Sequence, residues 1–161
     1  MHVVKPAPLI STPQGGTTVG GDGTVWQTFS SGPTRVAFRI EGNALENVIV
    51  GHMDGPVAAR LIHEFDGIVA VHGSCIGLHW WWDAPTYTSE YRALWMDWLA
   101  RQSRDGLPLE THFFTSSRIV RMGLAVANVA YAKIRFGIYD NEADYIALRR
   151  RFMKDAAPPK L

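Results

Sequence analysis

The sequence contains a single cysteine, no long apolar run and almost no net charge. Cys75 has no second cysteine for a disulfide or a metal knot, so we expect a small apolar strand residue in a reducing cytosol. No apolar segment approaches the roughly 18 to 20 residues that a membrane span needs. Residues 1–16 combine a lysine with prolines and lack an apolar core, so they do not predict a secretory signal. These absences predict a cytoplasmic protein without a membrane span.

The near-balance of charge also limits the classes of partner. Sixteen basic and fifteen acidic side chains leave a formal net charge of +1, which gives no electrostatic reason to expect nucleic acid. Hydrophobic residues make up 47% of the 161-residue chain, enough for the core of one domain. We predict this domain over residues 25–155. A flexible tail rich in Gly, Pro and Thr is expected over 1–24, and a short tail over 156–161.

Between the predicted tails, apolar patterns typical of strands and helices alternate. Strands are predicted over residues 24–30, 34–42, 47–55, 74–82, 110–117 and 133–140. A helix follows each of the last four strands, beginning near residues 54, 88, 118 and 141. This order predicts an α/β fold with a mixed, mostly parallel sheet of about five to six strands, an N-terminal antiparallel hairpin and about four helices.

Three consecutive tryptophans, Trp80–Trp82, lie in the predicted central strand. Successive strand residues face opposite sides of a sheet, so Trp81 should point away from its two neighbours. With helices on both faces, we expect Trp80 or Trp82 in the core. More aromatic residues follow on the next helix, and one core does not easily hold all of them. The surplus predicts either a surface that contacts a protein partner or a cavity for an apolar ligand.

The order of elements over residues 34–153 resembles the STAS-like domain of anti-sigma factor antagonists and sulfate transporters, in its standalone bacterial form. The segments that carry the resemblance are VIVGHMDGPVAARLIHEFDGIV (48–69), WWDAPTYTSEYRALWMDWL (81–99) and TSSRIVRMGLAVANVAYAKIRFGIYDNEADYIALRRRF (115–152). The resemblance implies a regulatory domain that binds other proteins and catalyses no reaction.

In the regulatory antagonists, a phosphorylatable serine follows the central strand inside an Asp-Ser-Ser/Thr-Gly-Leu element. The same place here reads DAPTYTS (83–89), which keeps the acid and lacks the Ser-Gly-Leu part. By position, Thr86, Thr88 and Ser89 are therefore candidates for a phosphate, which the free N–H groups of a helix N-terminus favour. The alternative is that Thr88 or Ser89 caps the helix and the others fill the loop.

Carboxyl ends of parallel strands gather at one edge, where open α/β sheets bind ligands. His52, His79 and Asp83 lie near this predicted edge and have the ligand types of a divalent metal or a general base. His79 is equally explained as a packed strand histidine, and nearby Asp54 as a helix cap. The chain has no nucleophile elbow, phosphate loop or dinucleotide fingerprint. We predict no catalytic residue, no metal and no cofactor.

The function predicted from the sequence is a non-enzymatic regulatory or interaction module. It would bind a protein partner or a second copy of itself through the region where the central strand meets the second helix: Trp81, Asp83, Thr86, Tyr87, Thr88, Ser89 and Tyr91. The alternative is a carrier of a small molecule or lipid, with a pocket lined by the tryptophans. A metal-dependent enzyme using His52, His79 and Asp83 is the third hypothesis.

Overall fold

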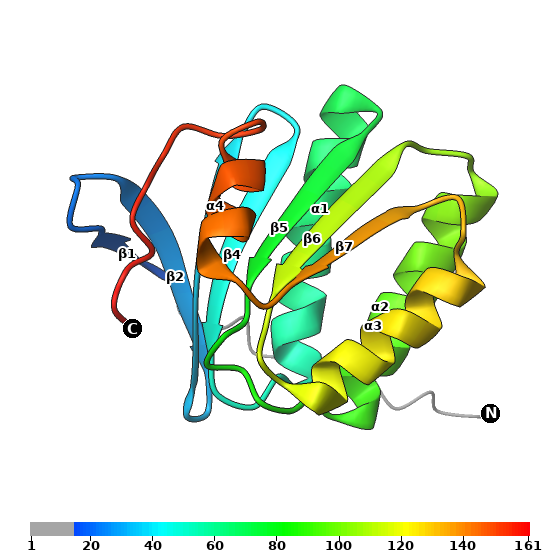
Figure 1. Cartoon of the computed structure of the whole chain (residues 1–161), viewed down its shortest axis with the longest axis horizontal. Coiled ribbons are helices and arrows are strands. Elements are labelled where there is room, and N and C mark those ends of the chain that lie inside the picture. The colour runs from blue at the N-terminus through cyan, green and yellow to red at the C-terminus, as the bar shows by residue number, and fades with distance from the viewer. Residues whose placement is uncertain (1–14) are drawn as a thin grey trace, which may run out of the picture.

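Residues 15–161, which this computed structural model describes, form seven strands in one sheet, arranged in sequence order (Figure 1). The strands are β1 (Gly16–Val19), β2 (Val25–Ser31), β3 (Thr34–Glu41), β4 (Ala44–Val50), β5 (Cys75–Trp80), β6 (Leu109–Phe114) and β7 (Arg135–Tyr139). The helices are α1 (Gly55–His72), α2 (Ser89–Arg104), α3 (Arg118–Ala130) and α4 (Glu142–Arg149).

The sheet is half antiparallel and half parallel. Strands β1 to β4 form an antiparallel meander, whereas β4, β5, β6 and β7 run parallel. Short turns at Gly32 and Gly42, whose positive φ angles of 53° and 59° suit glycine, force the antiparallel pairs. Helical crossovers make the others parallel. The prediction of a mostly parallel sheet with five to six strands and one hairpin is therefore corrected, while the four parallel strands are confirmed.

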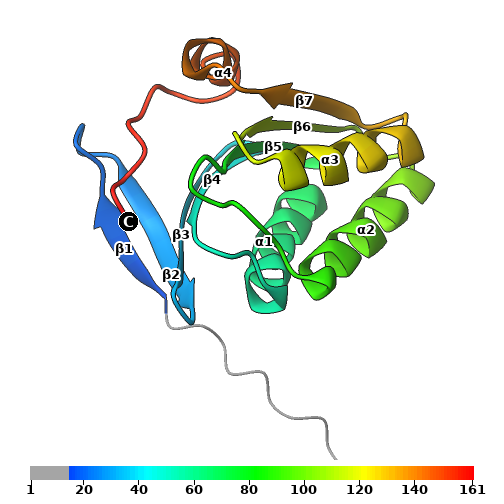
Figure 2. The ribbon, with the colours of Figure 1, turned by 60° about the horizontal axis from the view of Figure 1, so that its bottom comes forward.

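Helices α1, α2 and α3 cover one face of the sheet, and α4 with the C-terminal segment lies on the other (Figure 2). Each helix begins at a side-chain cap. Asp54 accepts a hydrogen bond from Val57 N–H, and Asn141 accepts from the first turn of α4. Thr88 and Ser117 cap α2 and α3 in the same way. Among residues 15–161, no helix is long and apolar enough to cross a membrane.

Parts of both predicted tails belong to the sheet or pack against it. Strand β1 pairs with β2 inside the segment predicted as flexible, because pairing with a neighbour stabilises a short strand of weak pattern. Ala156 is buried against Trp26, and Ala157 N–H donates a 3.0 Å hydrogen bond to Asp22. The predicted tail therefore differs from the structure at β1 and at the C-terminus, and residues 1–14 lie outside the described residues.

A buried ionic network fastens α4 to the sheet. Glu46 on β4 is fully buried and accepts hydrogen bonds from Arg39 Nε at 2.9 Å and from Arg149 Nη1 at 3.2 Å. Arg149 also donates to Asp155 at 2.6 Å, and Arg39 donates to the carbonyl of Lys154. Glu46 and Asp155 thus balance two buried guanidinium groups that link three separate parts of the chain.

The tryptophan strand is interior, between β4 and β6, as predicted. The faces of its side chains differ from the expectation. Trp81 is only 4% exposed and packs in the core under the three helices, while Trp82 is 41% exposed and stacks on Phe114. Trp80 is half-buried against Tyr145 on the α4 side. Since most of the helical cover lies on one face, the side chain that points to that face is the most buried.

Candidate functional site

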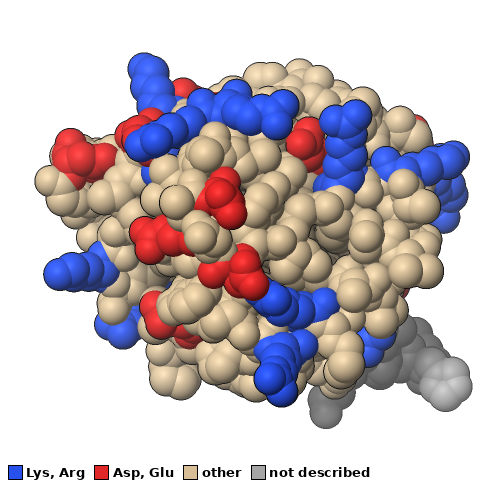
Figure 3. All heavy atoms as spheres, in the orientation of Figure 1, with Lys and Arg blue, Asp and Glu red and all other residues tan. Residues whose placement is uncertain are grey.

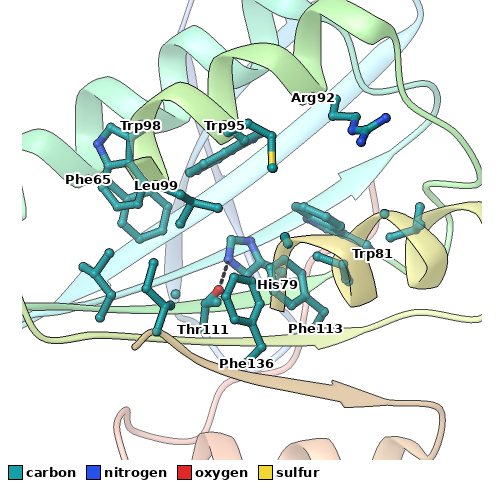
Figure 4. A pocket seen from close by; sticks show the side chains of 18 of the residues that line it. Phe65, His79, Trp81, Arg92, Trp95, Trp98, Leu99, Thr111, Phe113 and Phe136 are labelled. Carbon is teal, nitrogen blue, oxygen red and sulfur yellow. Dashed lines mark hydrogen bonds between the residues drawn. The ribbon is translucent and has the colours of Figure 1, made fainter. Parts of the chain in front are cut away.

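An apolar cavity of about 90 Å³ lies between the parallel strands and helices α2 and α3. Figure 4 shows Trp95 and Trp98 of α2 on one side, with His79, Thr111 and Phe113 of β5 and β6 opposite. The His79 and Trp95 rings are 6.4 Å apart between centroids and nearly perpendicular. Helix α3 closes a further side with Val120, Gly123 and Ala127. The site is therefore an aromatic pocket inside the main core.

Two glycines leave room for the side chains around this cavity. A Cβ on Gly77 would lie 2.7 Å from His79 Nε2 and 3.0 Å from Thr111 Oγ1, too close for either pair. A Cβ on Gly123 would collide with the hydroxyl of Tyr87. The small residues thus let polar groups of β5, β6 and the loop before α2 approach the pocket.

His79 is held as a neutral ring by a chain of buried hydrogen bonds. Trp81 Nε1 donates to Asn47 Oδ1 at 2.8 Å, which orients the Asn47 amide so that its Nδ2 donates to His79 Nδ1 at 2.8 Å. The His79 proton is then on Nε2, which donates to Thr111 Oγ1 at 2.9 Å. Burial, with a smaller contribution from His112, lowers the pKa of His79 to about 3. These contacts describe the packed strand histidine of the sequence analysis.

The residues of the metal hypothesis have separate partners. His52 Nδ1 pairs with Thr86 Oγ1 in the loop before α2. Asp54 accepts from Ser31 Oγ at 2.7 Å and caps α1. Asp83 is exposed, and its carbonyl accepts from Gly51 N–H at 3.0 Å. Over the described part of the chain, no three His, Cys, Asp or Glu side chains are grouped to hold a metal ion.

The structure separates the predicted partner-binding residues into two groups. Trp81 and Tyr91 are 4% and 3% exposed, so burial removes them from any contact surface and places them in the cavity wall. Tyr87 is half-buried beside them, with its ring centroid 6.3 Å from that of Tyr91. The remaining members lie in the loop before α2 or at its start, and Asp83 and Ser89 are the exposed ones.

Two hydroxyls proposed for phosphorylation already have structural partners. Thr88 Oγ1 accepts from Tyr91 N–H at 3.0 Å and caps α2. Thr86 pairs with His52. These contacts agree with the alternative to phosphorylation given above, in which one hydroxyl caps the helix and the others fill the loop.

The sequence analysis missed the contributions of β6, β7 and α3 to the pocket. Thr111, Phe113 and Phe136 line it from the sheet, and Ala127 lines it from α3. Gly77 and Gly123 were the available signal, because a glycine inside a strand or helix indicates close approach of another group.

Helix α3 also has an apolar outer face. The side chains of this face are 48% to 83% exposed and follow the alternating spacing of three and four residues: Ile119, Met122, Val126 and Val129. Figure 3 shows that the surface over α3, at lower right, is largely uncharged beyond the basic side chains near its start. The helix is thus apolar toward the cavity and apolar toward solvent.

An antiparallel meander that continues into four parallel strands, with three helices on one face, defines a STAS-like α/β domain. No protein-family model and no curated protein matches the sequence. Among solved structures, the chain is similar to an uncharacterized protein of the DUF3478 family with a SpoIIAA-like fold, from Shewanella loihica PV-4. The match has a TM-score of 0.54 and 13% identity and covers 74% of this chain and 98% of that one. This likeness confirms the predicted STAS-like fold.

Proposed function

We propose that this protein is a non-enzymatic cytoplasmic binding module that holds a small apolar molecule in the cavity under α2 and α3. The observation that carries the proposal is the void itself. Protein interiors are close-packed, with few spaces larger than a water molecule. An enclosed, dry cavity of about 90 Å³ would cost roughly 2 kcal/mol at the ~24 cal/mol per Å³ found for core cavities, and this is the upper limit for a pocket that opens at Arg92. A ligand that fills the space recovers part of this cost.

The volume limits the size of the ligand. An apolar cavity of about 150 Å³ holds benzene. Scaled from the six non-hydrogen atoms of benzene, a cavity of about 90 Å³ therefore suits a molecule of about four non-hydrogen atoms. Larger apolar molecules would fit only if α3 moved away from the sheet.

Xenon is a suitable probe because it enters apolar cavities and needs no hydrogen bond. We expect a saturable xenon NMR shift with the wild-type protein. The shift should be lost in Ala127→Leu, whose side chain fills the cavity, and retained in Ala125→Leu, which alters an exposed position on the same helix. Absence of saturable binding to the wild type, or equal binding by the two variants, would contradict the proposal.

A second candidate function, self-association, is favoured by the outer face of α3. The alternation of three and four residues from Ile119 to Val129 is the spacing by which two helices pack along a seam. Helix α3 has no acidic residue in its first turn and no basic residue in its last. An antiparallel pair would place Arg118 of one copy near the carbonyl end of its partner, where a cation is favoured. The occupant of this face is therefore a second copy of the chain.

The loop before α2 would extend this second interface. Ser117 Oγ, at the start of α3, donates a 2.6 Å hydrogen bond to the carbonyl of Pro85, so loop and helix are held together. Sedimentation should show a dimer that Met122→Glu dissociates, with the exposed substitution Ala93→Glu on α2 as the control. A wild-type monomer at all concentrations would rule out self-association and leave the cavity proposal unaffected.

A further inference from the structure

We infer that the molecule bound in the cavity is neutral and carries a hydrogen-bond acceptor, such as a carbonyl or ether oxygen, which Tyr91 Oη–H and Trp95 Nε1–H bind. This inference rests on the proposed function and names the chemical class of its ligand. Both residues line the cavity, and their buried donor atoms make no hydrogen bond of ordinary geometry within residues 15–161. The two groups are near neighbours, because the Trp95 side chain acts on the pKa of Tyr91. A buried donor without a partner is costly, and few exist in folded proteins.

Both unpartnered groups can donate a hydrogen bond, and only the Tyr91 oxygen can also accept one. An indole N–H can only donate. Burial raises the pKa of Tyr91, so its phenol keeps the proton and can donate it. Tyr91 is 3% exposed, which leaves its hydroxyl little access to bulk water. The missing partner of this pair is therefore an oxygen or nitrogen acceptor inside the pocket.

Thr111 adds a third donor on the opposite wall. Its hydroxyl accepts from His79 Nε2–H, so its own hydrogen remains free to donate (Figure 4). The neutral state of His79 fixes this direction, because Asn47 donates to its other nitrogen. An acceptor oxygen would thus meet donors from both α2 and β6, while the rest of the molecule lies among aromatic rings.

The absence of a buried charge in the wall makes the ligand neutral. Of the charged residues that line the cavity, Arg92 is exposed at its edge, and Glu110 accepts from His112 Nε2 at 2.8 Å. A carboxylate or ammonium group among the aromatic rings, away from Arg92 at the edge, would lose its hydration without an opposite charge to replace it. A neutral acceptor loses far less hydration free energy on entering the pocket.

Two probes of nearly the same shape separate this inference from general apolar binding. Acetone and 2-methylpropene, which are small enough for the cavity, differ by an oxygen in place of a terminal methylene. Tyr91→Phe should weaken binding of the ketone about fivefold to tenfold, the value of one hydrogen bond, and leave binding of the alkene within about twofold. In the wild type, the Trp95 indole N–H signal should move downfield with the ketone only.

Tyr145→Phe is the matched control, because Tyr145 is also buried with an unpartnered hydroxyl but lies on the α4 side of the sheet. It should change the affinity for neither probe. Trp95→Phe tests the second donor independently if Tyr91→Phe does not fold. Equal effects of Tyr91→Phe on ketone and alkene, or no effect on either, would overturn the inference while apolar binding stands. Failure of xenon and both probes to bind the wild type would instead refute the proposed function.

Discussion

The cavity makes Ala127→Leu a substitution that should stabilise the protein. Ala127 is 5% exposed on α3 and lines the void of about 90 Å³. The three added carbon atoms gain roughly 2 kcal/mol at ~0.8 kcal/mol per buried methylene, close to the roughly 2 kcal/mol that the void costs at most. Loss of side-chain freedom by leucine removes about 0.5 to 1 kcal/mol. We expect the free energy of unfolding to rise by about 1 kcal/mol.

Urea unfolding, followed by tryptophan fluorescence and far-UV circular dichroism, measures this change. The protein should first be extracted to remove bound small molecules, because a ligand would stabilise the wild type selectively. An unchanged m-value with a higher midpoint indicates a gain in stability, and Tm should rise by about 2 to 4 °C. The control Ala125→Leu, at an exposed position, should stay within about 0.5 kcal/mol of the wild type. If Ala127→Leu instead lowered the free energy of unfolding by about 1 to 3 kcal/mol, as overpacking does, there would be no free space beside Ala127 and the reasoning would be refuted.

Three further predictions concern buried groups. Glu46→Gln removes the buried carboxylate shared by Arg39 and Arg149, leaves them only the more exposed Glu41 and Asp155, and should cost about 3 kcal/mol in denaturant unfolding. Glu41→Gln at a half-exposed pair should cost less than about 1 kcal/mol. Burial raises the pKa of Cys75 to about 12, so a thiol reagent should react only after denaturant is added, and rapid labelling of the native protein would contradict this. His79 has a folded pKa of about 3 against 6.5 when unfolded, so its contribution to stability is lost as pH falls between these values, by up to ~1.4 kcal/mol per pH unit. His79→Gln should flatten this part of the stability curve, and parallel curves would count against the shift.

Local signals in the sequence predicted much of the fold. Asp54 and Asn141 were readable as helix caps, and both have that role. The apolar runs of β4 and β5 predicted parallel strands joined by a helix, and the structure confirms it. A strand was predicted over residues 133–140, and β7 forms there at the edge of the sheet. Each of these features depends on residues close together in the chain.

The face of each tryptophan could not be predicted in the same way. The alternation of β5 separates Trp81 from Trp80 and Trp82, but it does not say which face carries three helices and which carries one. That difference arises from the crossovers, which place α1, α2 and α3 together (Figure 2). Gly77 and His79 share the face of Trp81, so one polar residue and one glycine stand on the more deeply buried side.

The cavity depends on residues from at least five separate elements and therefore has no local pattern. Its floor comes from β5, β6 and β7, its roof from α2 and one side from α3. The unpartnered state of Tyr91 and Trp95 is likewise a property of their neighbours, since either residue alone reads as an ordinary core aromatic. The sequence offered a pocket lined by tryptophans only as an alternative to a contact surface.

Helix α3 connects the two proposed activities. Its inner face, with Gly123 and Ala127, closes the cavity, and its outer face, with Met122 and Val129, is the proposed contact between copies. When a second copy holds α3, the helix is less free to move away from the sheet. Ligand binding to the dimer would then cost less conformational entropy than binding to the monomer. Binding free energies are reciprocal, and the ligand would then strengthen the dimer by the same factor. For larger ligands, the coupling between binding and dimerisation would have the opposite sign. These ligands require α3 to move outward and would therefore favour the monomer.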